Sequence, residues 1–245
     1  MTTGAQPSAG GTRFLFEPPA QPAIPVQGES ALYAVHRIFC VGRNYVEHAK
    51  EMGVEPEREA PWYFTKPATA IVLSGSMVPY PPGTQNYHYE MELVVAIGAP
   101  AYFAETDQAL SAVFGYATGL DMTRRDLQMA ERAKSRPWDI GKAFEQSAVI
   151  APITKRDQFG NIGPQRITLA VNGETKQNAL LSQMIWSVPE IISHLSRYYH
   201  LGPGDLIYSG TPAGVGPVKP GDRLTGKING LAPVELTIAE SDRVA

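Results

Sequence analysis

The feature that most constrains the fold of this chain is a series of short apolar runs separated by glycine and proline. Between Arg37 and Glu240 these runs are RIFCVG, TAIVLSG, ELVVAIG, VFGYATGLD, ITLAVNG, DLIYSGTP and VELTIAE. Runs of this length, with turn residues between them, are typical of β-strands. Helical periodicity is confined mainly to YVEHAKEMG, TRRDLQMAERAK and VPEIISHLSRYYH, the last with one apolar face of Ile191, Ile192, Leu195 and Tyr199. The sequence therefore predicts a β-rich α+β fold.

The length and composition favour one large domain that follows an N-terminal extension. A chain of 245 residues that is 43% hydrophobic can bury a sizeable core. Residues 1–12 are small and polar and are predicted to be disordered, and the proline-rich FEPPAQPAIPV stretch from Phe16 is predicted to lie extended over a surface. No internal repeat or central linker is visible. We therefore expect a partly disordered extension over 1–35 and one domain over 36–245.

Charge and cysteine content restrict the partners and the compartment. A net charge of −3 and a pI near 6.0 give no electrostatic reason to expect nucleic acid or an anionic membrane as partner, so a small-molecule substrate is expected. Cys40 is the one cysteine and cannot form an intramolecular disulfide. No stretch has the features of a signal peptide, and no apolar run approaches the roughly 18 to 20 residues that span a bilayer. A cytoplasmic location is expected.

The run HYEMELVVAIG, which begins at His88, carries two carboxylates on one face of a predicted strand. Side chains alternate along a strand, so Glu90 and Glu92 point the same way. Neighbouring carboxylates repel, and one takes up a proton unless a cation lies between them. Asp121 ends the next buried run, where Thr123 is a predicted N-cap of the following helix.

These three acids form an all-oxygen set that suits Mg²⁺, Mn²⁺ or Ca²⁺ better than Zn²⁺ or copper. His88 is expected to be a hydrogen-bonded neighbour rather than a fourth ligand. Taken alone, alternating glutamates also fit the solvated face of a strand. The metal site is therefore a hypothesis that needs support from other motifs.

Further polar residues with helical spacing can serve catalysis. His48 and Glu51 are three positions apart, so the carboxylate can orient the imidazole as a general base toward water. Arg125 and Gln128 have the same spacing, and an arginine binds a substrate carboxylate through two parallel hydrogen bonds. Each pair, taken alone, also fits an ordinary helix surface.

The remaining candidates are Lys142 in PWDIGKAF, Lys66 in FTKP and Thr211 in SGTPAGVG. The last stretch lacks the Lys-Ser/Thr ending of a phosphate-binding loop, so it is predicted to be a turn.

Six ordered motifs together resemble one enzyme family. They are G-R-N-Y-x-x-H-x-x-E at 42–51, F-x-K-P at 64–67, H-x-E-x-E at 88–92, G-x-x-x-x-L-D-M-T-x-R-D-x-Q at 115–128, K-x-F at 142–144 and S-G-T-P-x-G-V-G-P-V at 209–218. From residue 36 to about 238 the chain resembles the fumarylacetoacetate hydrolase family. Within it the chain is most similar to the short acylpyruvate hydrolases, and FEPPAQPAIPV and PWYFTKPATAIV resemble bacterial members that cleave fumarylpyruvate in the gentisate pathway.

The resemblance implies a fold with a mixed β-roll core, usually in a homodimer, with Mg²⁺ or Mn²⁺ bound by Glu90, Glu92 and Asp121. It implies that His48 and Glu51 activate water, and that Arg125, Gln128, Lys142 and Thr211 face the substrate. Lys142 or Gln128 can also stabilise an oxyanion. The role of Lys66 stays open between a structural lysine and one at the rim of the site.

The implied reaction is metal-dependent hydrolysis of the carbon–carbon bond of an acylpyruvate, with fumarylpyruvate giving fumarate and pyruvate. The distal carboxylate of that substrate needs a cation, for which Arg43 and Lys66 are candidates, although Arg43 can equally brace its own loop. The alternative is oxaloacetate decarboxylation or diketo-acid isomerisation on the same metal site, which needs no attacking water. A catalytically silent metal-binding protein is disfavoured because every motif residue is present.

Overall fold

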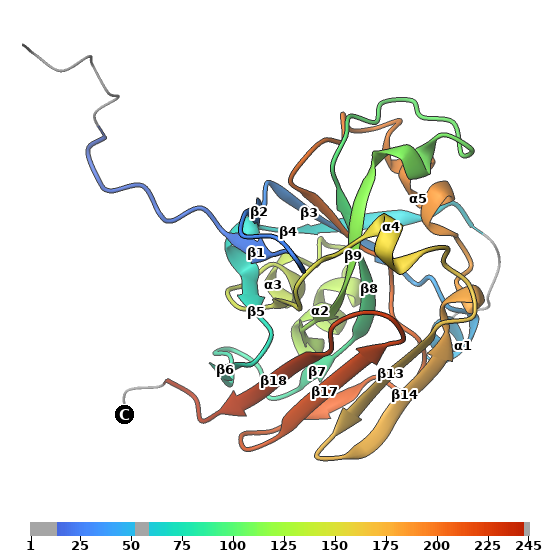
Figure 1. Ribbon diagram of the computed structural model, residues 1–245. Helices are drawn as coiled ribbons and strands as arrows, with labels where there is room; N and C mark the ends of the chain where they lie inside the picture. The colour runs from blue at the N-terminus through green and yellow to red at the C-terminus, as the bar shows by residue number, and fades with distance from the viewer. Residues whose placement is uncertain (1–13, 52–58, 243–245) are drawn as a thin grey trace, which may run out of the picture.

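The computed structural model describes residues 14–51 and 59–242, which fold around a curled mixed β-sheet, as Figure 1 shows. The largest sheet has the order β4-β3-β15-β8-β9-β11-β5, with β12 paired to β9. Its strands are β4 (Trp62–Lys66), β3 (Arg37–Gly42), β15 (Asp205–Tyr208), β8 (Met91–Ile97), β9 (Val113–Asp121), β11 (Ala148–Ile150), β5 (Ile71–Leu73) and β12 (Thr154–Lys155). Because β15 pairs with β3 and β11 with β5 in parallel, and the other neighbours are antiparallel, the sheet is mixed.

Three smaller sheets complete the described fold. A five-stranded sheet packs against β8 and β9 and has the order β14 (Glu174–Leu180), β13 (Arg166–Val171), β17 (Arg223–Ile228), β18 (Val234–Ala239) and β6 (Ser76–Pro79). A three-stranded sheet contains β10 (Thr123–Arg124), β7 (Tyr87–Tyr89) and β16 (Gly216–Val218), and β1 (Ala23–Pro25) pairs with β2 (Leu32–Ala34).

Helices are short and lie between these sheets and at their edges. They are α1 (Val46–Glu51), α2 (Arg125–Ala133), α3 (Asp139–Lys142), α4 (Arg156–Phe159) and α5 (Val188–Leu195), with single 3-10 turns at Ala68–Ala70, Ala109–Ala112 and Leu181–Gln183. Among the described residues no helix is long and apolar enough to cross a bilayer. The β-rich α+β prediction and all seven predicted strand runs are confirmed.

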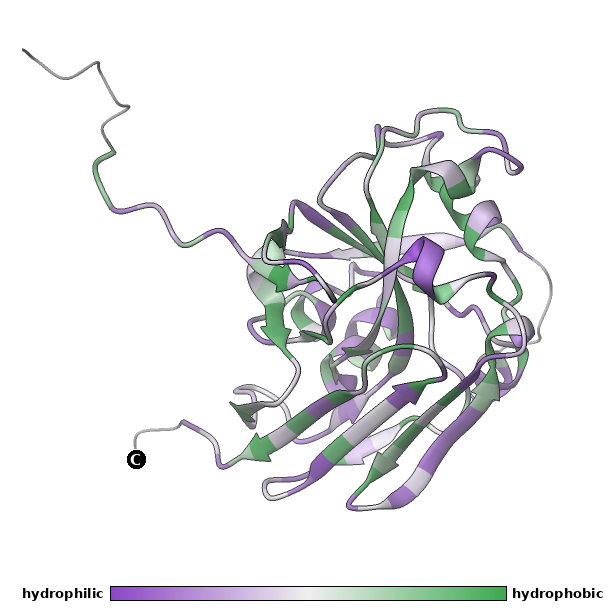
Figure 2. Ribbon diagram, in the orientation of Figure 1, coloured by the Kyte–Doolittle hydropathy of each residue, from purple (hydrophilic) through white to green (hydrophobic). Residues whose placement is uncertain are grey.

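The core lies on both faces of β8 and β9. Leu93 and Val95 join the cluster that includes the five-stranded sheet, whereas Val94 and Ala96 join a second cluster on the opposite face. A strand buried on both faces reads as a continuous apolar run, which is what ELVVAIG is. Figure 2 shows this contrast, because β8 is mostly hydrophobic while the outer strand β14 is mostly hydrophilic.

Three local predictions need correction. The run from His88 is not one strand, because β7 ends at Tyr89 and β8 begins at Met91 in a different sheet. Thr123 does not cap α2, since it belongs to β10 and its hydroxyl donates to the Asp121 carbonyl. Tyr199 is not on the face of α5, because that helix ends at Leu195.

Only the first part of the described N-terminal extension is exposed, and the rest packs against the main domain. Residues 14–21 are exposed, whereas Ile24 and Val26 are buried, and Gln27 donates its backbone N–H to the Ile153 carbonyl at 2.8 Å. The stretch predicted to be disordered, 1–12, lies outside the described residues. The division at 35/36 stays a prediction.

Candidate active site

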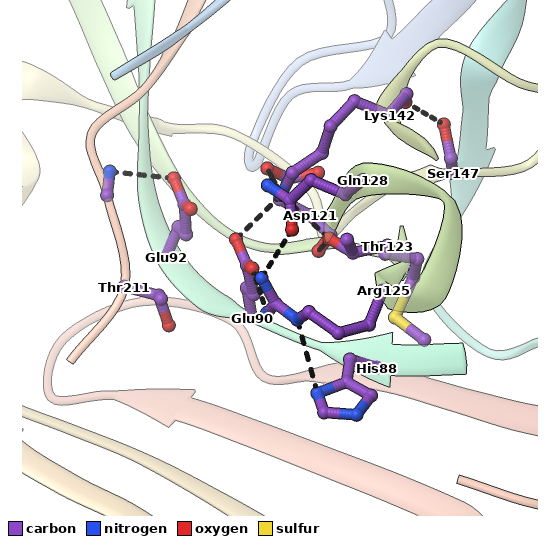
Figure 3. Close-up of polar contacts among 12 residues, drawn as sticks. His88, Glu90, Glu92, Asp121, Thr123, Arg125, Gln128, Lys142, Ser147 and Thr211 are labelled. Carbon is purple, nitrogen blue, oxygen red and sulfur yellow. Dashed lines mark hydrogen bonds and ion pairs between the residues drawn. The ribbon is translucent and has the colours of Figure 1, made fainter. Parts of the chain in front are cut away.

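Three carboxylates meet where two paired strands change sheet. The Asp121 N–H donates to the Glu90 carbonyl at 2.9 Å, which aligns the break between β7 and β8 with the end of β9. Glu92 lies two residues after Glu90, in β8, and its side chain reaches the same cluster. One carboxylate oxygen from each of the three residues lies within 4.8 Å of the others, and all three side chains are buried. Figure 3 shows Glu90, Glu92 and Asp121 with the polar side chains around them.

Buried cations surround this cluster. Arg125 Nη2 lies 2.5 Å from Glu90 Oε1, and Lys142 Nζ lies 2.8 Å from Glu90 Oε2 and 2.7 Å from Asp121 Oδ2. Lys66 Nζ lies 2.9 Å from Asp121 Oδ1 as an ion pair. Burial acts to raise the pKa of Glu90, but the charges of Lys142 and Arg125 outweigh it, and its pKa is well below the usual value. Glu90 is therefore held ionised.

Glu92 has a different environment. Burial raises its pKa well above the usual value, and the negative charges of Asp121 and Glu90 add to this effect. A hydrogen bond from the Gly210 N–H to Glu92 Oε2 at 2.7 Å and the charge of Lys142 oppose this shift. A divalent cation among the three acids would remove both the repulsion and the desolvation cost, and an all-oxygen donor set fits Mg²⁺ or Mn²⁺. The residues present therefore fit such a metal.

The predicted His48 and Glu51 pair lies on α1, beside the carboxylates. His48 is 5% exposed, and its Nδ1 lies 3.3 Å from Glu51 Oε2. Burial lowers the pKa of His48, while the charge of Glu90 and the hydrogen bond with Glu51 oppose that shift. The imidazole is thus neutral near pH 7, which a general base requires.

The SGTPAGVG stretch is a loop, as predicted, but its backbone takes part in the site. Gly210 has a φ of +98°, and a Cβ there would lie 2.7 Å from the Asn44 side chain, so only glycine places this N–H against Glu92. The Gly214 N–H donates to Glu51 Oε1 at 2.8 Å. Thr211 Oγ1 accepts from Gln177 Nε2 at 2.8 Å, which leaves its own proton for a ligand. Gln177, on β14, was not anticipated.

Helix α2 presents a row of polar groups to the same space. Arg125 Nη1 donates to Gln128 Oε1 at 2.5 Å, so the amide nitrogen is what Gln128 can offer to a ligand. Arg125 Nε lies 3.4 Å from His88 Nδ1, and His88 Nε2 lies 2.8 Å from Asn86 Oδ1. His88 is therefore the hydrogen-bonded neighbour that the sequence suggested.

One pocket collects most of the predicted residues. Its lining includes Arg43, His48, Glu90, Glu92, Arg125, Gln128, Lys142 and Thr211. Asp121 is fully buried beneath it, and Glu51 stands behind His48. The pocket also has an aromatic wall of Trp62, Phe64 and Trp138 and a further arginine, Arg132, none of which the sequence analysis singled out. Arg132 could have been predicted from the sequence, because its spacing from Arg125 and Gln128 places all three on one face of a helix.

Lys66 lies under the site rather than at its rim. Its side chain is fully buried, and Nζ donates to the carbonyls of Met122 and Lys142 and to Ser147 Oγ. It cannot reach the distal end of a substrate, so the structural alternative for this lysine is favoured.

The chain is similar to several known proteins. A fumarylpyruvate hydrolase from Ralstonia sp is 50% identical over 189 residues, which cover 77% of this chain and 98% of that protein. The crystal structure of fumarylpyruvate hydrolase from Pseudomonas aeruginosa in complex with Mn²⁺ and pyruvate has a TM-score of 0.91 at 48% identity, covering 94% of this chain and 100% of that one. A mitochondrial oxaloacetate tautomerase from Homo sapiens is 38% identical over 205 residues, or 84% of this chain and 92% of that protein.

A family profile described as the fumarylacetoacetate (FAA) hydrolase C-terminal region matches residues 37–239. The chain therefore belongs to the fumarylacetoacetate hydrolase family.

Proposed function

We propose that this protein is a metal-dependent hydrolase that cleaves the carbon–carbon bond of an acylpyruvate, with fumarylpyruvate giving fumarate and pyruvate. The observation that carries the proposal is the buried His48 with its Glu51 partner in the same pocket as three clustered carboxylates. Hydrolysis requires a base that activates water, whereas decarboxylation and tautomerisation need no attacking water. The relatives named fumarylpyruvate hydrolase, at 50% and 48% identity, support the same substrate.

Glu90, Glu92 and Asp121 are the proposed ligands of Mg²⁺ or Mn²⁺. The Mn²⁺ in the Pseudomonas aeruginosa structure supports a divalent cation, and the buried oxygen donors suit either ion. When bound, the cation supplies Lewis-acid stabilisation of negative charge on the pyruvoyl oxygens. The ion pairs of Glu90 with Arg125 and Lys142 hold that ligand ionised and in place.

His48 begins the proposed reaction by taking a proton from water, whose oxygen forms a bond to the acyl carbonyl carbon. Glu51 stabilises the imidazolium that results. The carbonyl oxygen becomes an oxyanion, and the Gln128 amide is our candidate donor to it. Lys142 is proposed to act there through its positive charge, because its three N–H groups donate to Glu90, Asp121 and Thr123. Collapse of the oxyanion breaks the bond to the pyruvoyl methylene carbon. That carbon leaves as the enolate of pyruvate, and protonation from His48 restores the base and completes both products.

Arg125 and Thr211 are proposed to orient the pyruvoyl end. Arg125 is 6% exposed and lies beside Glu90, so its guanidinium can pair with a carboxylate next to the metal ligands. Thr211 stands on the opposite side of the pocket, on the loop that also contacts Glu92. The two residues would fix which carbonyl faces His48.

Oxaloacetate decarboxylation or tautomerisation is the second candidate. It is supported by the 38% identity to the human oxaloacetate tautomerase, which is lower than the identity to the hydrolases. The test is pyruvate release from fumarylpyruvate, acetylpyruvate and oxaloacetate, each with Mn²⁺, with Mg²⁺ and after chelation. Metal-dependent release from the diketo acids is expected, and release from oxaloacetate alone would reject the hydrolase.

Three finer proposals accompany this function. A place in gentisate catabolism follows from the substrate, and a homodimer follows from the family resemblance. A cytoplasmic location is supported by the unpaired, buried Cys40. Sedimentation of the purified protein tests the homodimer.

A further inference from the structure

One fully buried glutamine beside the pocket takes no part in the proposed chemistry. Gln177 lies on β14, where its side chain is buried although the residues on either side of it are exposed. Burying a carboxamide costs folding free energy unless its polar groups find hydrogen-bond partners. An apolar side chain of similar size would cost less at such a position, so the presence of a glutamine needs an explanation.

The Gln177 carboxamide joins two segments that carry residues of the site. Its Oε1 accepts from the Met91 N–H at 3.0 Å. Its Nε2 donates to Thr211 Oγ1 at 2.8 Å and to the Pro212 carbonyl at 2.7 Å. Met91 lies between the two clustered glutamates in the sequence, and Thr211 lines the pocket. One side chain thus ties the strand of the carboxylate cluster to the glycine-rich loop.

The backbone partners of Gln177 fix the orientation of its carboxamide. A backbone N–H can only donate, so the Met91 N–H must face Oε1, and a carbonyl can only accept, so that of Pro212 must face Nε2. The second N–H of Nε2 is then directed at Thr211 Oγ1, which must accept it. A flipped carboxamide would leave both backbone groups unsatisfied.

This constraint decides how the Thr211 hydroxyl meets a ligand. A hydroxyl has a single proton, and within residues 14–51 and 59–242 no hydrogen bond from Thr211 uses it. Since Oγ1 already accepts from Gln177, the proton is the group that Thr211 presents to the pocket. Carboxylate, keto and enolate oxygens are the acceptors that suit such a donor.

Bracing of the loop accounts for only part of this arrangement. The hydrogen bonds of Gln177 to Met91 and Pro212 are sufficient to join the strand to the loop. The third hydrogen bond adds little to that connection, but it orients a side chain of the pocket.

We infer that Gln177 is a positioning residue that fixes the Thr211 hydroxyl as a hydrogen-bond donor to an oxygen of the pyruvoyl group. This inference rests on the proposed function, which places Thr211 at that end of the substrate. Gln177 is not among the residues that line the pocket, so it acts through Thr211 and not by touching the ligand.

A double-mutant cycle with a binding readout tests this role. Oxalate presents adjacent oxygens like those of a pyruvoyl group and has no bond that a hydrolase of acylpyruvates would cleave. Calorimetry on the Mn²⁺-loaded protein should show that Gln177→Met and Thr211→Val each weaken oxalate binding at least about fivefold, the scale of one hydrogen bond. Adding Gln177→Met to Thr211→Val should weaken binding by less than about twofold more, because the hydroxyl through which Gln177 acts is already gone.

A second variant covers the case in which Gln177→Met does not fold. Gln177→Glu keeps the size of the side chain and the acceptor for Met91, but a carboxyl group has at most one proton, which the Pro212 carbonyl takes. The Thr211 hydroxyl can then donate to the new carboxyl group instead of the ligand. Oxalate binding should weaken at least about fivefold in the parental protein and less than about twofold in Thr211→Val.

Two variants serve as controls. Thr211→Ser keeps the hydroxyl and should retain oxalate affinity within about twofold. Gln165→Met makes the same change at a glutamine that also bridges two backbone groups, the Gly163 N–H and the Asn161 carbonyl, but does not line the pocket. It should leave oxalate affinity at the parental value.

The outcomes separate this inference from the proposed function. If no diketo acid is hydrolysed but the Gln177 effect on oxalate binding depends on the Thr211 hydroxyl, only the proposed function fails. If the Gln177 variants weaken oxalate binding as much in Thr211→Val as in the parental protein, or in neither, the positioning role is rejected even in an active hydrolase.

Discussion

The backbone N–H of Gly214 lies 2.8 Å from Glu51 Oε1, and so it fixes the carboxylate whose other oxygen faces His48. Glu51 is partly exposed, with 39% of its side chain accessible, and without this contact it would have several rotamers to choose from. The glycine-rich loop thus sets the orientation of Glu51 relative to His48, and it also contacts Glu92 through Gly210.

Gly214→Ala should therefore lower kcat with little change in metal affinity. Gly214 has a φ of +94°, and a Cβ there would lie 2.1 Å from the Lys176 carbonyl oxygen, so the loop must move and release Glu51. Gly221→Ala is the control, since Gly221 has a φ of +90° but open space around its Cβ position. It imposes the same backbone strain away from the site. We expect a loss of at least about tenfold in kcat for Gly214→Ala only. Equal losses in the two variants would point to strain alone.

His48→Ala should reduce turnover of the diketo acid by roughly two to four orders of magnitude, the usual scale for loss of a general base. Metal affinity, measured by calorimetry, should be retained because His48 is not among the three clustered acids. His48→Asn, which keeps a polar side chain of smaller size, should not restore activity. Any oxaloacetate decarboxylation should survive the change, and an equal loss of both reactions would assign His48 a structural role instead.

The pH profile of kcat should report the neutral form of His48. Since burial lowers the pKa of this histidine, the base stays unprotonated further into the acid range than an ordinary histidine with a pKa of about 6.5. Activity should therefore be full near pH 7 and fall only as pH drops below about 6.5.

Glu51→Gln should change both the pKa of His48 and the stabilisation of the imidazolium formed in the reaction, and the two changes can be measured separately. Both its hydrogen bond and its charge raise the pKa of His48, so their removal lowers that pKa and moves the acid limb to lower pH. The plateau of kcat should fall at the same time, because the imidazolium formed in the reaction loses its partner. A limb that moves to higher pH would show that another group is being titrated.

Local sequence patterns were sufficient for the residues that sit on one strand or one helix. The helical spacing of His48 and Glu51 follows from backbone geometry alone. The two-residue spacing of Glu90 and Glu92 also brought these acids together, although Glu90 lies in the break between β7 and β8. The strand runs were recognisable for the same reason, since burial on both faces of β8 leaves a continuous apolar stretch.

Contacts between distant segments were beyond such patterns. The bond from Gln177 to Thr211 joins residues on two different segments, and no periodicity links them. The strand break at Glu90 arises because β7 and β8 pair in different sheets. The N-cap of α2 was predicted wrongly because the Thr123 hydroxyl forms hydrogen bonds with Asp121 and Lys142 instead. Trp62 lines the pocket only because Gly42 lets it lie against the backbone.

Glu90→Gln and Glu92→Gln should have different effects on the Tm of the metal-free protein, although both changes remove a proposed metal ligand. Glu90 forms ion pairs with Arg125 and Lys142, all three buried, so its neutralisation leaves two cations poorly matched. Breaking a buried pair costs about 3 kcal/mol. For a chain of this size that lowers Tm by roughly 6 to 12 °C. Glu92 has no ion pair among the described residues and lies beside two other acids, so its neutralisation should leave Tm unchanged or raise it.

Adding Mn²⁺ should then raise Tm in the parental protein and in neither variant. Binding stabilises a folded protein by about 2.7 kcal/mol when the metal is present at 100 times its Kd. Thermal unfolding of chelated and Mn²⁺-loaded samples measures both effects in one experiment, with Glu235→Gln as the control because this partly exposed glutamate pairs with Arg223 on the outer sheet. A Glu92→Gln protein that still gains the full parental Tm increase would remove Glu92 from the metal site, whatever its activity.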